Sequence, residues 1–141
     1  MKKMGLAALL IPALFLLTLS LPATEADNKT RPEDRDWATY VFDGSSTADM
    51  NGRCLEAYAT LEQRMDNVFK QLLSEIDDEA DALAKQNQED WQRYALSKRS
   101  FDADIYRGGT LSGPSAGISY ISELCRRIKE LNHAIEARQP H

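Results

Sequence analysis

Apolar side chains recur every three or four residues from Met50 to Ile135, and this spacing constrains the fold more than any other feature of the sequence. In a helix with 3.6 residues per turn, such a spacing places the apolar side chains on one face. The first stripe contains Met50, Cys54, Leu55, Tyr58, Leu61, Met65, Val68, Phe69, Leu72, Leu73 and Ile76. The spacing therefore predicts a long amphipathic helix that begins near Ala48.

Two further stripes predict two more helices. The second stripe contains Leu83, Trp91, Tyr94, Ala95, Phe101 and Ile105, and the third contains Ile118, Ile121, Leu124, Cys125, Ile128, Leu131 and Ile135. Asp77-Asp78-Glu79 is expected to cap the second helix, and Gly108-Gly109 is expected to end it. The fold class expected is all-α, an antiparallel three-helix bundle with long helices.

The first 26 residues have the pattern of a cleavable signal peptide. A basic start, Met1-Lys2-Lys3-Met4, precedes a mostly apolar run from Gly5 to Leu21. The alternative is a membrane anchor, but the run is short for a span and no basic flank follows it. We expect cleavage after Ala26, with Ala23 as the second choice, and a periplasmic or secreted product without a stable membrane anchor.

The remaining chain divides into a lead over residues 27–48 and a helical domain over residues 49–138. The lead mixes charged residues with turn formers, and we expect it to be flexible or extended. Within it, Trp37 to Phe42 is an aromatic and β-branched run typical of a strand. Because an isolated strand has no partner for its backbone, we expect this run to lie extended against the helices or to be mobile.

The chain has two cysteines, Cys54 and Cys125. In an oxidising compartment an even number of cysteines indicates disulfides, and two residues allow one intramolecular pairing. In an up-down-up bundle both residues fall within two to three turns of the same end, so we expect one disulfide. The alternative is a pair of free buried thiols.

The net charge of −5 argues against one class of partner and favours another. Nucleic-acid binding requires Lys and Arg to release counterions from phosphates, so an acidic domain is not expected to bind nucleic acid. A protein partner of an acidic surface is expected to be basic.

The sequence shows no pattern that predicts catalysis, a metal or a cofactor. His133 and His141 have no second ligand at metal-binding spacing, and Gly108-Gly109 is not followed by the Gly-Lys-Ser/Thr of a phosphate loop. The acidic Asp77-Asp78-Glu79 run lacks the glycine and alternating ligands of a calcium loop. A glycosidase-like carboxylate pair has little support, because a small bundle offers no deep pocket. We therefore expect a binding protein and not an enzyme.

Two features are candidates for partner binding. The aromatic stripe of Trp91, Tyr94, Phe101 and Tyr106 is either a binding face or part of the core, and its helical spacing favours the core. The partner-binding residues that we expect lie in the following loop, which combines an aromatic ring, a cation and a flexible backbone. They are Tyr106, Arg107, Gly108, Gly109 and Thr110.

Several motifs, taken in order, resemble the N-terminal domain of the lysozyme-inhibitor LprI-like family of exported bacterial proteins. They are the segment Cys54-Leu55-Glu56-Ala57-Tyr58, the run from Leu61 to Leu73 that includes Phe69, the spaced Gln88, Trp91 and Tyr94, the Tyr106-x-Gly108-Gly109-Thr110 segment, and more loosely Leu124 and Leu131. The core motif carried by this resemblance is Leu61, Phe69, Gln88, Trp91 and Tyr94. The resemblance covers Cys54 to Leu131.

The chain also departs from the family pattern. Asp66 stands where asparagine is usual, Ala95-Leu96 replaces an Arg-Asp pair, and Arg99 and Tyr120 stand where members often have further cysteines. The resemblance implies an envelope or secreted protein that inhibits a lysozyme. Lysozymes are commonly basic, so the acidic charge of this chain would favour their association. The alternative is a periplasmic interaction, structural or immunity-type module that does not bind lysozyme.

Overall fold

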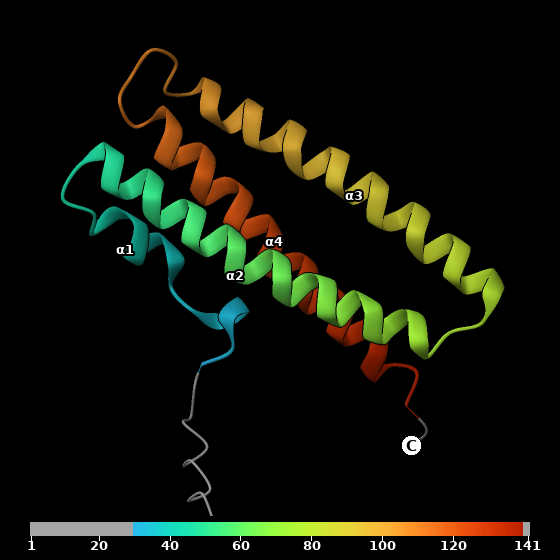
Figure 1. The fold of residues 1–141 in the computed structure, drawn as a ribbon. Helices are drawn as coiled ribbons and strands as arrows, with labels where there is room; N and C mark the ends of the chain where they lie inside the picture. Colours follow the sequence, from blue (N-terminus) through green and yellow to red (C-terminus); the bar gives the residue numbers. More distant parts are fainter. Residues whose placement is uncertain (1–29, 140–141) are drawn as a thin grey trace, which may run out of the picture.

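The computed structural model describes residues 30–139, so the predicted signal peptide over residues 1–26 lies outside the described residues. Within residues 30–139 the chain forms four α-helices and one 3-10 helix, and no strand (Figure 1). In chain order they are η1 (Pro32–Asp34), α1 (Trp37–Phe42), α2 (Thr47–Ser74), α3 (Asp78–Asp104) and α4 (Ser112–Glu136). The all-α class is confirmed, but the count of three helices is wrong.

Local side-chain hydrogen bonds fix where the helices begin. The side chain of Ser46 accepts a hydrogen bond from the Asp49 backbone N–H at 3.1 Å and caps α2. Asp77 accepts from the Ala80 N–H at 2.9 Å and caps α3, as predicted. These carboxylate and hydroxyl oxygens satisfy N–H groups that have no partner within the helix.

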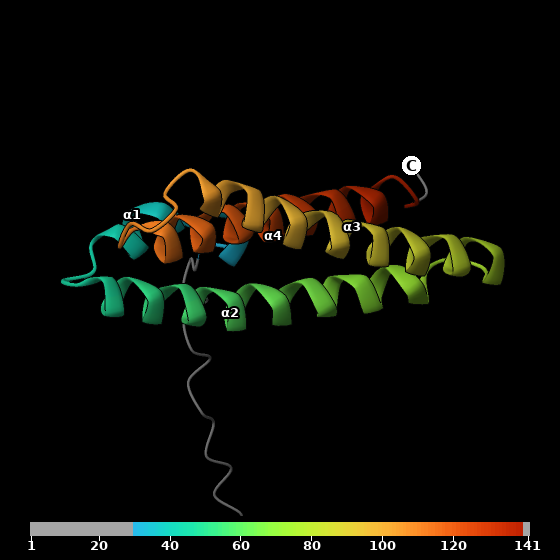
Figure 2. The same cartoon turned by 90° about the horizontal axis from the view of Figure 1, so that it is seen from above.

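Helix α4 lies at the centre of the packing. It packs along both α2 and α3, whereas α2 and α3 make few contacts with each other (Figures 1 and 2). The core therefore forms mainly between α2 and α4. Its fully buried side chains include Leu61, Val68, Ile121, Leu124 and Ile128.

The segment from Trp37 to Phe42 is helical, which corrects the expectation of an extended or mobile segment. Asp36 caps this helix by accepting a hydrogen bond from the Thr39 N–H at 3.0 Å. Trp37 and Val41 are four residues apart, so one helical turn brings both side chains into the core. The indole N–H of Trp37 donates to the Pro32 carbonyl oxygen at 2.7 Å, which ties η1 to α1.

The predicted disulfide is also wrong, because Cys54 and Cys125 are both free. Cys54 on α2 packs directly against Gly117 of α4. Cys125 is eight residues further along α4, a displacement of about 12 Å at 1.5 Å per residue. A disulfide requires Cα atoms within about 7 Å, so the two residues do not pair: Cys54 lies near the start of α2, whereas Cys125 lies near the middle of α4.

A cluster of aromatic rings and one arginine joins the three long helices near Cys54. The rings of Tyr58 on α2 and Tyr120 on α4 meet edge to face at 5.2 Å between centroids. The Arg99 guanidinium of α3 lies 5.5 Å from the Tyr58 ring and 5.9 Å from the Tyr120 ring. Arg99 and Tyr120, the two positions at which the resembling family often has cysteines, are therefore neighbours in space.

Candidate partner-binding site

The loop between α3 and α4 contains the predicted binding residues and is exposed along its whole length. All five of Tyr106, Arg107, Gly108, Gly109 and Thr110 lie on the surface. The Gly109 N–H donates to the Tyr106 carbonyl oxygen at 2.8 Å, which closes a tight turn over Tyr106 to Gly109.

Gly108 allows this turn to form. Its φ is +75°, a left-handed conformation at the third position of the turn, where glycine has no steric penalty. A Cβ on Gly108 would meet nothing within 4 Å, so the backbone there is open to solvent. The double glycine therefore both turns the chain and leaves a thin tip.

Large apolar side chains surround the base of the loop. Phe101, on the last turn of α3, is 74% exposed, and Ile105, the residue that follows α3, is 71% exposed. Phe42, Tyr106 and Leu111 are also exposed. We call these five residues, together with Arg107, Gly108, Gly109 and Thr110, the loop-end surface.

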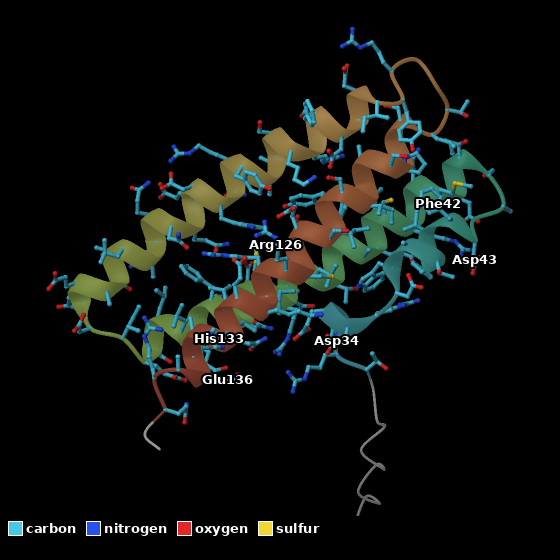
Figure 3. The ribbon with its side chains drawn as sticks, turned by 180° about the vertical axis from the view of Figure 1, so that it is seen from behind. Asp34, Phe42, Asp43, Arg126, His133 and Glu136 are labelled. Carbon is cyan, nitrogen blue, oxygen red and sulfur yellow. The ribbon has the colours of Figure 1, made fainter. Side chains whose placement is uncertain are left out.

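A shallow depression brings parts of the loop-end surface together from separate elements. Phe42 from the end of α1 lines it with Ile105 and Tyr106, and Figure 3 shows Phe42 at this end of the bundle. The floor is the first turns of α4, through Ser115, Ile118 and Ser119. Residues far apart in sequence therefore share one surface.

The aromatic stripe that was expected to belong to the core is mostly exposed. Of its four residues Trp91 is buried, whereas Tyr94 is 50% exposed and Phe101 and Tyr106 lie on the surface. The reason is that α3 packs on α4 and has little contact with α2, so only a narrow strip of α3 is covered. Of the other core-motif residues, Leu61 is buried and Phe69 and Gln88 are half-buried.

Two ion pairs lie beside the loop-end surface. The Lys98 ammonium donates to Asp102 at 2.5 Å, and the Ser119 hydroxyl donates to the same carboxylate oxygen. These two hydrogen bonds, with that of Lys98 the stronger effect, hold the pKa of Asp102 below its usual value. The Arg107 guanidinium donates through Nε to Asp104 at 2.6 Å.

Four unpaired acids gather at the opposite end of the bundle. Glu75, Asp77, Asp78 and Glu79 lie exposed around the turn between α2 and α3 and form no ion pair within residues 30–139. An apolar groove between the three long helices lies beside this turn. The turn between α2 and α3 is therefore acidic.

The described part of the chain contains no arrangement typical of a metal site or a membrane span. No three His, Cys, Asp or Glu side chains among residues 30–139 converge as metal ligands. In the same range no helix has both the length and the apolarity that crossing a bilayer requires. His133, which the sequence placed on a polar helix face, is exposed on α4 (Figure 3).

Comparison with known protein families identifies the family of the chain. Residues 42–131 match the family model described as Lysozyme inhibitor LprI. The chain belongs to the LprI family. The match extends from the end of α1 to the last turns of α4, so it includes the whole loop-end surface. No significant match was found among curated proteins or among solved structures.

Three residues of this LprI-family surface, Phe42, Ile105 and Leu111, were not identified from the sequence. Phe42 belonged to a segment interpreted as an extended lead, and Ile105 was assigned to the buried stripe of its helix. A signal for Ile105 was present, because Leu83, Tyr94, Phe101 and Ile105 fall within 40° of one another on a helical wheel and Trp91 and Ala95 lie to one side. No signal in the sequence indicated that Phe42 lies beside the loop.

Proposed function

We propose that this chain inhibits a lysozyme by binding to it outside the cytoplasm, and that the loop-end surface makes the contact. Membership of the LprI family supports a role as an inhibitor that has a protein partner and no chemistry of its own. The predicted signal peptide supports action in the periplasm or outside the cell.

The observation that carries the choice of surface is the exposure of several large apolar side chains at one end of the bundle. Clustered exposed apolar residues indicate a protein-binding surface, whereas single ones have no such meaning. Aromatic residues are enriched where protein interfaces have their strongest contacts, and Phe42, Phe101 and Tyr106 provide three rings.

The net charge supports the choice of partner. A chain of net charge −5 attracts a basic enzyme at long range and raises the association rate. The unpaired acids at the far end contribute to this attraction without touching the partner. The apolar residues and the loop then form the short-range contact.

A cell-wall lysis assay tests the function. Purified protein that lacks residues 1–26 is mixed with lysozymes of the c, g and i types, and inhibition of at least one type is expected at micromolar concentration. Unchanged lysis with all three types would reject the function and would leave the alternative of an envelope interaction module.

Two matched variants test the surface. Phe101→Ser removes a 74% exposed ring from the loop-end surface, and we expect it to weaken inhibition about tenfold or more. Leu55→Ser removes a 66% exposed side chain from α2, a helix that contributes no residue to that surface, and we expect inhibition within about threefold of the unmodified protein. Equal effects of the two variants would argue against the loop-end surface.

A further inference from the structure

Arg107 is the most exposed of the basic side chains that form an ion pair within residues 30–139. Its side chain is 81% exposed, compared with 8% for the buried Arg127 on α4. It stands at the second position of the turn that ends α3, directly before Gly108 and Gly109. The structure therefore places a cation at the exposed tip of the loop between α3 and α4 of an acidic protein.

The ion pair of Arg107 does not hold it firmly. Its partner Asp104 is itself 53% exposed, and the two residues are three positions apart at the end of one helix. Exposed pairs of this kind contribute little to stability, so a partner protein can take over the guanidinium at small cost. Because the two glycines that follow have no side chains, a narrow cleft can close around the tip of the loop.

The chemistry of lysozymes supplies a matching group. Glycosidases of this type use two carboxyl groups that flank the scissile bond, about 5 Å apart in retaining enzymes. An arginine fork matches a carboxylate through two parallel hydrogen bonds, and a water-poor cleft strengthens them. The acidic body of this protein would be repelled by such a cleft, but the tip of the loop would be attracted.

We propose that Arg107 enters the substrate cleft of the lysozyme and forms an ion pair with a catalytic carboxylate. Inhibition is then competitive with the glycan, because the arginine occupies the position of the scissile bond. Tyr106, Phe101 and Ile105 rest on the walls of the cleft on either side of the tip. This inference rests on the proposed function and adds the group that is recognised.

A double-mutant cycle tests the contact. Dissociation constants are measured for the protein and for Arg107→Ala, each against an active lysozyme and against the same lysozyme with both of its catalytic carboxyl residues replaced by glutamine, here called the glutamine enzyme. Arg107→Ala should weaken binding to the active enzyme by about 30-fold or more. Against the glutamine enzyme the same substitution should cost much less, because the carboxylate is absent.

Arg93→Ala is the matched control. Arg93 lies on α3, the helix that precedes the loop, is 70% exposed and pairs with an acid three positions before it, as Arg107 does. It lies far from the loop, and its substitution should change binding to both enzymes by less than about threefold. A soluble chitin oligosaccharide should compete with the unmodified protein for the enzyme.

The possible outcomes separate the inference from the function on which it rests. If the unmodified protein binds no lysozyme, both are wrong. If it inhibits, but Arg107→Ala loses equal affinity for the two enzymes or no more than Arg93→Ala does, the contact with the carboxylate is wrong and the inhibition remains. Inhibition that the oligosaccharide does not relieve would also overturn the inference.

Discussion

Replacing Gly117 by alanine tests the closest approach between α2 and α4. Gly117 is buried in the second turn of α4, opposite Cys54. A Cβ at this position would overlap the Cys54 sulfur and would lie 3.1 Å from both the Cys54 Cβ and the Tyr58 hydroxyl oxygen. Cys54 is 3% exposed, so its side chain has little space into which it can move. The two helices must therefore separate locally to accept the methyl group.

Two opposing effects set the size of the change in stability. Alanine favours a helix over glycine by about 1 kcal/mol. Overpacking of a filled core costs about 1–3 kcal/mol, and more where backbones must shift, as they must here. We expect Gly117→Ala to lower the free energy of unfolding by about 1–2 kcal/mol net. Unfolding in urea, followed by circular dichroism at 222 nm, measures this difference.

A matched glycine on α2 and a double variant serve as controls for the effect of Gly117→Ala. Gly52 lies exposed on α2 with nothing within 4 Å of a Cβ, so Gly52→Ala should raise the free energy of unfolding by up to about 1 kcal/mol. In a Cys54→Ala background, Gly117→Ala should cost much less, because the sulfur is gone. A Gly117→Ala protein as stable as the unmodified one, or an unchanged cost in the Cys54→Ala background, would show that the helices do not approach as described.

Three other expected outcomes concern the thiols, the short helix α1 and alkaline pH. When the unfolded protein is treated with an alkylating reagent in the absence of reductant, mass spectrometry should show two added alkyl groups, and in the folded protein the 3% exposed Cys54 should be protected. An unfolded protein that gains no alkyl group would show that the two cysteines form a disulfide. Trp37→Ala should lower the free energy of unfolding by about 3 kcal/mol in urea titration, because it empties a buried indole site; a change below about 1 kcal/mol would mean that α1 is not docked. Burial first, and the nearby Glu62 charge second, raise the pKa of Tyr120 to about 12. Since the unfolded tyrosine ionises near pH 10, this stabilisation is complete below pH 10 and is lost between pH 10 and 12, by at most about 2.7 kcal/mol, and Tyr120→Phe should show a smaller loss across that range.

Local patterns in the sequence were sufficient to predict the three long helices and where α2 and α3 begin, whereas α3 ends at Asp104, before the predicted Gly108-Gly109. Apolar residues at three- and four-residue spacing predicted α2, α3 and α4, because only one face of each helix is buried. Asp77 was correctly predicted to cap α3, because capping depends on a side chain and a backbone N–H three residues away. The exposed loop at Gly108-Gly109 was predicted for the same local reason.

Long-range packing explains the parts that were not predicted. The Trp37 to Phe42 run has strand-forming residues, but the core between α2 and α4 offers a site for two side chains four positions apart, and this selects a helix. The cysteines were placed at one end of the bundle by topology, but pairing depends on the level of each residue, which the contact of Cys54 with Gly117 sets.

Residue order and composition alone were sufficient to specify the helical segments of α2 to α4, the acidic charge and the family. Which of the apolar residues are buried in the core and which stay exposed depends on how the helices pack. Phe101 and Trp91 have the same helical spacing, but α3 packs against α4 along a narrow strip and leaves Phe101 in solvent. The exposure of an apolar side chain depends on which other helices lie beside its own helix. The spacing of apolar residues along one helix carries no information about how many neighbours that helix has.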